Sequence, residues 1–470
     1  MYHPELAGKV DAQRQAIMNM GKDIEAEARR CFPGGHLVTA TYRQSTLALE
    51  QTATLLMDPT VPAIFEGAFQ FQGTFVRVDV LERMDDHTWR LIEIKASSRA
   101  KAVHLDDLTL QTYVLLSAGL TLSASCLMHV NRQYLFKGDV PDVQQLFAIQ
   151  DFMETVQERL PAVPGQLAAM RAVLTEAAPP VIAPGPRCHT PHSCPFWEYC
   201  TETKPARWIY HLPGKKETFY KLTKRGIVTI DDIPSDFSLT DIQRRMKENV
   251  EWISPQLLSR LRTISYPLHH LDFETLMPGI PLYEGTRPYQ PLPVQWSNHI
   301  ECQDHRLHHD AFLSRTQQDP REEFVVTLLA SLGTEGNICV YSEYEQYVLL
   351  ALAEAIPQYK RELLQVVGRL WDLLSVIQSF YYHPGFSGSF SIKSVLPALI
   401  PSLSYHGLDI QDGVQATAAH YRMVFLETDW VERERLATAL LEYCARDTLA
   451  MVELRKILLD KAEHAIDPSL

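Results

Sequence analysis

Alternating apolar and polar positions divide the chain into two stretches of predicted strands and helices. In the N-terminal stretch, the pattern predicts helices over residues 11–30 and 45–57. Two strands are predicted over residues 74–81 and 89–95, and the polar residues 84–87 between them predict a hairpin turn. A long run of helical spacing and a proline-containing linker follow, over residues 144–177 and 178–186.

The C-terminal stretch alternates in the same way. The pattern predicts strands beginning near residue 264 and covering 294–300 and 337–341, with helices over 319–332, 345–355 and 436–458. Alternating strands and helices favour the α/β fold class. Between the stretches, residues 206–262 are rich in lysine and arginine, which predicts either a contact with nucleic-acid phosphates or a solvated spacer.

Length and charge narrow the possible functions. With 470 residues the chain is long enough for two or three domains. The net charge of −13 argues against a non-specific polycationic nucleic-acid binder, although it leaves room for a local basic groove. No membrane-spanning run of about 20 apolar residues and no signal pattern are found in the sequence, so we expect a cytoplasmic protein without membrane contact.

A D-x-E pair stands at the predicted strand that begins near residue 264. Asp272 and Glu274 are two positions apart, so on a strand both side chains project from the same face. Two carboxylates held close together repel each other unless a cation lies between them. Solvated acids at a strand end are the simpler interpretation for an isolated pair.

Further acids can complete a metal site with this pair. Tyr443 and Asp447 are four positions apart on the predicted C-terminal helix and therefore share one face. Glu345 follows a buried strand, and Asp372 is the alternative acid for the same role. Four such acids would hold two divalent ions about 4 Å apart, and Tyr443 would orient the attacking water.

A second acidic set occurs on the two N-terminal strands. Glu93 and Lys95 share one face of their strand, and Asp79 can lie opposite them on the preceding strand. Acids that bind a divalent ion, together with a lysine that positions water and stabilises phosphate charge, suit phosphodiester cleavage. A cross-strand ion pair at the surface is the competing interpretation.

The N-terminal block of about two hundred residues resembles the PD-(D/E)xK nucleases of the RecB and Cas4 kind. The resemblance is carried by Glu66, Asp79, Glu93-Ile94-Lys95 and the predicted helix containing Gln111. It implies that Glu66, Asp79 and Glu93 bind metal, that Lys95 is catalytic and that Gln111 belongs to a Q-x-x-x-Y element. The tyrosine, Tyr113, comes two residues after the glutamine, so this element is matched only in part.

The same resemblance extends to four cysteines. Cys31 precedes the catalytic core of the block, and Cys188, Cys194 and Cys200 follow that core, in the order that Cas4-like and AddB-like nucleases use to hold an iron–sulfur cluster. Four thiolates match the number that a [4Fe–4S] cluster requires. The C-x5-C-x5-C spacing is wider than is usual in the family, and a structural Zn²⁺ site that includes His189 or His192 is the alternative.

The C-terminal block resembles the DnaQ-like, DEDD-type 3′–5′ exonucleases with an RNase H-like fold. The matching residues are Asp272, Glu274, Glu345, Tyr443 and Asp447, with a glutamate where the exonucleases usually carry the second aspartate. The block is also similar to the DUF2779 family, whose members join a Cas4-like block to a DnaQ-like block. The resemblance implies metal binding by the four acids and a catalytic Tyr443.

These observations predict two nuclease centres on one chain. We expect a PD-(D/E)xK domain over residues 1–205, a basic helical connector over 206–262 and a DEDDy exonuclease domain over 263–470. Both centres would use Mg²⁺ or Mn²⁺ and act on nucleic acid, with DNA favoured over RNA. The alternative is a nucleic-acid-binding scaffold, or a nuclease with one inactive centre.

Overall fold

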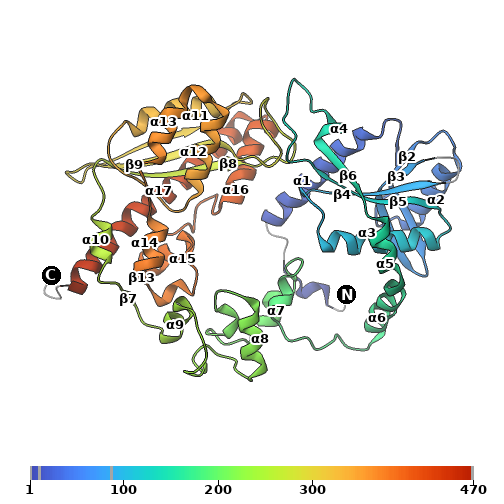
Figure 1. The fold of residues 1–470 in the computed structure, drawn as a ribbon, viewed down its shortest axis with the longest axis horizontal. Helices are drawn as coiled ribbons and strands as arrows, with labels where there is room; N and C mark the ends of the chain where they lie inside the picture. Colours follow the sequence, from blue (N-terminus) through green and yellow to red (C-terminus); the bar gives the residue numbers. More distant parts are fainter. Residues whose placement is uncertain (1–2, 9–11, 85–87, 467–470) are drawn as a thin grey trace. The chain divides into compact units, whose positions relative to one another are not determined.

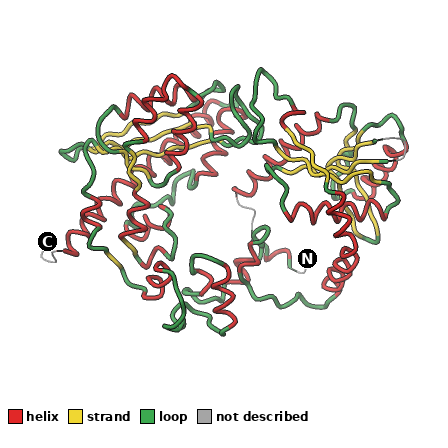
Figure 2. The backbone as a smooth tube through the Cα atoms, viewed as in Figure 1, coloured by secondary structure: helices red, strands yellow, loops and turns green. Residues whose placement is uncertain are grey.

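The computed structural model describes residues 3–8, 12–84 and 88–466, and it divides into two compact units. The first unit contains Met1–Ala183 and Met277–Gln290, and the second contains Pro184–Leu276 and Pro291–Leu470. Each unit has its own mixed β-sheet with helices packed against it (Figures 1 and 2). The chain is therefore an α/β protein, as predicted. Most of the predicted hairpin turn, residues 85–87, lies outside the described residues.

The sheet of the first unit contains six strands that follow one another in chain order. The strand pairs β1–β2 and β4–β5 are parallel, and the other neighbours are antiparallel. Their bounds are β1 (His36–Leu37), β2 (Ala63–Phe71), β3 (Thr74–Arg83), β4 (Trp89–Lys95), β5 (Leu122–Val130) and β6 (Phe147–Asp151).

Helices and an inserted segment enclose this sheet. Residues of α2 (Ser45–Met57), α3 (Ala102–Ser117) and α5 (Met153–Arg159) join one apolar cluster of the unit. A second cluster contains Ile24 of α1 (Ala12–Ala28), together with Ile280 and Tyr289 of the inserted segment Met277–Gln290. Two further helices, α4 (Val143–Leu146) and α6 (Val163–Thr175), complete the unit.

One sequence-based prediction for this unit is wrong. Residues 144–177 do not form continuous helix, because β6 lies between α4 and α5. β6 pairs antiparallel with β5 from Cys126↔Asp151 to Val130↔Phe147 and so extends the sheet by one strand. The hydrogen bonds to β5 are tertiary, and they override the local helical spacing.

The sheet of the second unit has the strand order β10-β9-β8-β11-β12. β8 is antiparallel to β9 and parallel to β11, so this sheet is also mixed. The bounds are β8 (Leu268–Leu276), β9 (Leu292–Glu301), β10 (Leu307–Leu313), β11 (Ile338–Val340) and β12 (Leu370–Asp372). A separate two-stranded sheet pairs β7 (Trp252–Ile253) with β13 (Tyr381–Tyr382).

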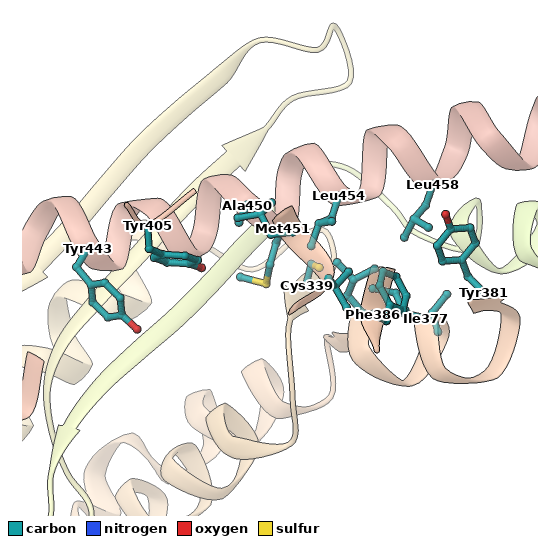
Figure 3. Packing of buried hydrophobic residues seen from close by; sticks show 14 of the residues in the cluster. Cys339, Ile377, Tyr381, Phe386, Tyr405, Tyr443, Ala450, Met451, Leu454 and Leu458 are labelled. Atoms are coloured by element: carbon teal, nitrogen blue, oxygen red, sulfur yellow. The ribbon is translucent and has the colours of Figure 1, made fainter. Parts of the chain in front are cut away.

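Two helical layers cover this second sheet (Figure 1). One apolar cluster joins strand residues to α11 (Arg321–Leu332), α12 (Tyr344–Ala355) and α13 (Lys360–Val367). The other cluster is built around the long C-terminal helix α17 (Trp430–Ile466), and Figure 3 shows side chains of α17 packed against Phe386 and Tyr381. The cluster also includes residues of α14 (Leu373–Phe380), α15 (Ile392–Leu399) and α16 (Gly413–Tyr421).

The basic connector belongs to the second unit. It contains α8 (Lys216–Lys224), α9 (Asp241–Glu248) and α10 (Leu257–Leu261), and α7 (Trp197–Thr201) precedes it. The lysines of α8 are exposed, whereas Leu222 of the same helix is buried. Within the described residues, no helix is both long and apolar enough to cross a bilayer.

Candidate functional site

The acid pair Asp272 and Glu274 lies on β8, where side chains alternate between the two faces of the sheet. Leu271 and Phe273 are buried in the cluster formed with α11 and α12. Asp272 and Glu274 therefore point to the opposite face, toward α17. The alternation predicted from sequence is confirmed for these residues. As a result, both carboxylates face the same neighbouring element.

That neighbour is the face of α17 that carries Tyr443 and Asp447. Ligand oxygens of Asp272, Glu274 and Asp447 all lie within 4.8 Å of one another. Carboxylate oxygens are the ligands that Mg²⁺ and Mn²⁺ prefer, so this donor set fits a divalent cation. Tyr443 projects from the same helix, with its hydroxyl pointing away from the helix axis (Figure 3).

Glu345 is the fourth acid of this site. It stands at the beginning of α12, which follows β11 after a short turn, and only 4% of the residue is exposed. Among the described residues, its Oε2 atom has no hydrogen-bond partner. A buried carboxylate oxygen without a partner is costly, and a cation in the adjacent cleft would supply the missing interaction.

Asp372, the alternative fourth acid, has a different role. Its side chain caps α14 by accepting a hydrogen bond from the Leu374 backbone N–H, with a distance of 2.9 Å. Asp372 is not among the residues that line the cleft, whereas Glu345 is. The placement favours Glu345 as the acid of the second motif.

The cleft that contains these acids has a volume of about 610 Å³. Its wall combines the acids with aromatic side chains and one lysine. The lining includes Asp272, Glu274, Glu345, Asp447, Phe273, Tyr341, Tyr344, Phe390, Tyr443 and Lys393. Aromatic faces beside a carboxylate cluster suit a ligand that has both a stacking surface and a metal-binding group, as a nucleotide has.

Burial raises the pKa values of all four acids, and the charges of neighbouring carboxylates add to this effect for Asp272, Glu274 and Glu345. Burial, followed by the charge of Asp447, raises the pKa of Asp272 and of Glu274 well above their usual values. Burial is also the main cause that raises the pKa of Glu345 to about 8 and that of Asp447 to about 6. Without a cation, the site therefore retains protons near neutral pH, and a bound cation would displace them.

Three neighbours of the acids were missed by the sequence interpretation. The Tyr405 hydroxyl donates a short hydrogen bond to Asp447 Oδ1, and the Cys444 thiol donates to Asp272 Oδ2 over 3.4 Å. Lys393 lies near the rings of Tyr405 and Tyr443. Cys444 adjoins a predicted site residue, but the loop containing Tyr405 carries no periodic pattern that would have indicated its position.

In the first unit, Asp79, Glu93 and Lys95 come together at the junction of β3 and β4. The pairing of these strands runs from Arg83↔Trp89 to Val80↔Ile92. Beyond it, Asp79 Oδ2 accepts a hydrogen bond from the Ile94 backbone N–H at 2.7 Å. Lys95 Nζ lies 2.6 Å from Glu93 Oε1. The sequence prediction that the three side chains share one region is confirmed.

Helix α3 completes this first cluster. Gln111 Nε2 donates to Glu93 Oε2 at 2.8 Å, and Lys95 Nζ donates to Asp107 Oδ2 at 2.7 Å. The predicted glutamine therefore reaches the cluster, although the tyrosine of its motif, Tyr113, packs against Phe71 in the apolar core. Asp107 was not singled out from the sequence.

The charges of this cluster compensate one another. Burial raises the pKa of Glu93 to about 7, and the Lys95 ammonium opposes that rise. Burial and the Glu93 charge also raise the pKa of Asp79 well above its usual value. Within the described residues, the carboxylates that lie close enough together to bind a cation are those of the second unit. In the first cluster, the Lys95 ammonium pairs with Glu93 instead.

The Glu66 carboxylate is held by two arginines rather than by Lys95. Glu66 has a φ of 57°, which is uncommon for a residue other than glycine, and it stands within β2. Its carboxylate pairs with Arg29 at 2.9 Å and with Arg77 at 3.2 Å. Glu25 on α1, which was not predicted, is close enough for its charge to raise the pKa of Asp79, after burial and Glu93.

The four predicted cluster cysteines are divided between the units. Cys31 belongs to the first unit, and its thiol donates to the Val143 carbonyl over 3.4 Å. Cys188, Cys194 and Cys200 belong to the second unit, where the Cys194 N–H donates to the Cys188 carbonyl at 2.7 Å. No close group of thiols is found among the described residues, so the iron–sulfur cluster and the zinc alternative stay predictions.

Comparison with known proteins gives one match. Residues 269–391 match the family model described as Domain of unknown function (DUF2779). The matched region includes Asp272, Glu274 and Glu345, and it ends before Tyr443 and Asp447. No curated protein matches the chain. No solved structure matches it either. The DUF2779 similarity predicted from sequence is thus confirmed for this region.

Proposed function

We propose that the second unit is a divalent-metal-dependent phosphodiesterase that removes nucleotides from the 3′ end of a nucleic acid. The main support is the group formed by Asp272, Glu274 and Asp447, whose ligand oxygens lie within 4.8 Å of one another. Glu345 adds a buried oxygen that lacks a partner among the described residues. The 3′–5′ polarity rests on the resemblance of the D-x-E and Y-x-x-x-D motifs to DEDD exonucleases.

The four acids would hold Mg²⁺ or Mn²⁺, and bound cations would stabilise negative charge on the attacking and leaving oxygens. The protein supplies the orientation. Tyr443 lines the cleft beside Asp447, where its hydroxyl can orient the attacking water. Tyr405 fixes Asp447 by donating to one of its oxygens. Burial strengthens the electrostatic interactions of this arrangement.

For the first unit we propose a second phosphodiester-cleaving centre at Asp79, Glu93 and Lys95. Its support is the convergence of these three residues with Gln111, as in the PD-(D/E)xK nucleases. Opening the Lys95–Glu93 pair would make the Glu93 carboxylate available to Mg²⁺ or Mn²⁺ and the ammonium available to phosphate. DNA is the favoured substrate of this centre by resemblance.

Digestion of end-labelled single- and double-stranded DNA and RNA tests both proposals. The wild-type protein is incubated with Mg²⁺, with Mn²⁺ or with EDTA, beside the variants Asp447→Asn and Lys95→Met. We expect Asp447→Asn to abolish stepwise shortening from the 3′ end. Lys95→Met should abolish the cleavage that is not stepwise shortening from the 3′ end. Each loss should exceed about a hundredfold, because each variant removes a group that acts on the transition state.

The outcomes separate the proposals from the scaffold alternative. If the wild-type protein binds these nucleic acids but cleaves none of them with either metal, the chain is a binding scaffold. If one variant abolishes all cleavage, only the corresponding centre is active. Cleavage that persists in a protein carrying both substitutions would contradict the assignment of both sites.

A further inference from the structure

Lys393 places a positively charged side chain on the wall of the acidic cleft. It stands near the start of α15 and is half-buried. Its charge lowers the pKa values of Glu274 and Asp447 and thereby opposes the effect of burial on both. The ammonium is therefore close enough to the acids to act on whatever they bind.

Three groups fix the position of this ammonium. Lys393 Nζ donates to the Gln411 backbone carbonyl at 2.9 Å. It also lies 5.5 Å from the ring centroid of Tyr405 and 5.4 Å from that of Tyr443, within the range of cation–π attraction. An ammonium has three N–H donors, so a position held through one of them leaves two donors for a ligand.

The charge balance of the cleft indicates which ligand group the two remaining N–H donors of Lys393 would bind. When all four acids are ionised they carry four negative charges, which two divalent cations would neutralise in full. The positive charge of Lys393 then has no acid left to neutralise, and it lies beside Tyr443 on the wall of the cleft. Phosphate oxygens are strong acceptors for a lysine ammonium.

We infer that Lys393 binds a non-bridging oxygen of the phosphate at the 3′-terminal linkage of the substrate. The inference rests on the proposed function of the second unit, because it assigns the ligand of the same cleft. The competing role is a structural counter-ion, in which Lys393 only offsets the charge of the acids. The two roles differ in whether Lys393 senses charge on the substrate.

Binding of two fluorescent oligonucleotides separates these roles. One oligonucleotide has a natural 3′-terminal linkage, and the other has a neutral methylphosphonate at that single position. Affinity is measured by fluorescence anisotropy with Ca²⁺ in place of Mg²⁺, for the wild-type protein, Lys393→Gln and Lys393→Arg. We expect the wild-type protein to prefer the charged linkage by about tenfold, because a hydrogen bond to a charged group is lost in the neutral one.

The same contact should disappear in Lys393→Gln, which is expected to prefer the charged linkage less than the wild-type protein does and to bind the charged oligonucleotide about tenfold more weakly than wild type. Lys393→Arg should keep the preference. Lys360→Gln serves as the matched control, since Lys360 is exposed and does not line the cleft. Its affinities should equal those of the wild-type protein.

Two results would overturn the inference. One is a wild-type protein with no preference for the charged linkage. The other is a Lys393→Gln protein that keeps the full preference. Because binding is measured without turnover, a protein that shows the preference but cleaves nothing with Mg²⁺ or Mn²⁺ would overturn the proposed hydrolysis and leave the phosphate contact in place.

Discussion

At the scale of single residues, the candidate metal centre is defined by which oxygens already have partners. Asp372 accepts a backbone N–H and is satisfied as a helix cap. Glu345 is buried, and its Oε2 is without a partner among the described residues. The two acids are similar in chemistry, and their surroundings assign them different tasks. This difference can be tested by removing one charge at a time.

Glu345→Gln should reduce Mg²⁺-dependent shortening of a 5′-labelled oligonucleotide by about a hundredfold or more, because it removes a charge from the metal site while conserving volume. Asp372→Asn should leave the rate within about twofold of wild type, since asparagine caps a helix as well as aspartate does. The measurement is initial rate at saturating substrate. Equal losses in both variants would contradict the assignment of Glu345.

At the scale of elements, α17 combines the site with the core of the second unit. Tyr443 and Asp447 are residues of this helix. About two turns further along, Arg455 forms a buried ion pair with Glu301 of β9 at 3.3 Å. Only 5% of the Arg455 side chain and 4% of the Glu301 side chain are exposed. Although burial favours protonation of Glu301, the neighbouring His270, whose Nε2 lies 3.8 Å from Oε2, and the Arg455 charge lower its pKa to about 2.

Arg455→Ala should destabilise the second unit by about 3–5 kcal/mol, because it leaves the Glu301 carboxylate buried without its charged partner. The free energy of unfolding is measured by urea denaturation followed by circular dichroism. Lys456→Ala on the same helix is the control, since Lys456 is exposed and pairs with Glu453 at the surface. A loss for Arg455→Ala no larger than that of the control would show that the pair does not stabilise the unit.

At the scale of the whole molecule, the buried acids link metal binding to pH. The four acids of the second unit have pKa values above those of the unfolded chain, which are about 4. Their contribution to the stability of the metal-free protein is complete below that value. It is lost as pH rises through the folded values, about 6 for Asp447 and about 8 for Glu345.

The rise in Tm caused by Mn²⁺ should therefore be larger at about pH 8.5 than at about pH 5.5, because protons compete with the cation for the same oxygens. Differential scanning fluorimetry with and without Mn²⁺ at both pH values provides the measurement. In the double variant Asp272→Asn/Asp447→Asn, the difference between the two pH values should shrink. An increase in Tm that is independent of pH would argue against a buried acidic metal site.

The cysteine prediction also concerns the whole molecule, since Cys31 and the other three cysteines belong to different units. Protein purified without oxygen should be brown and contain about four iron and four sulfide per chain if a [4Fe–4S] cluster is present. Cys194→Ser should then lose the colour and the iron. A colourless protein with stoichiometric zinc would contradict the cluster and support the zinc alternative.

The sequence predicted those site features that depend on local geometry. Residues two apart on a strand or four apart on a helix must share a face, which is why Asp272 with Glu274 and Tyr443 with Asp447 could be paired before the fold was known. The same rule grouped Glu93 with Lys95. In each case the backbone period alone determines the direction of the side chains.

Only the tertiary structure decided which of these faces meet. Tyr405 and Lys393 reach the acidic cleft from a loop and a helix whose positions depend on long-range packing, so no local spacing indicated them. The same is true of β6, whose pairing with β5 outweighs its helical pattern. Local sequence determined the orientation of the acids, whereas the burial that raises their pKa values arises only from the packed fold. The same packing leaves Glu345 Oε2 without a partner among the described residues.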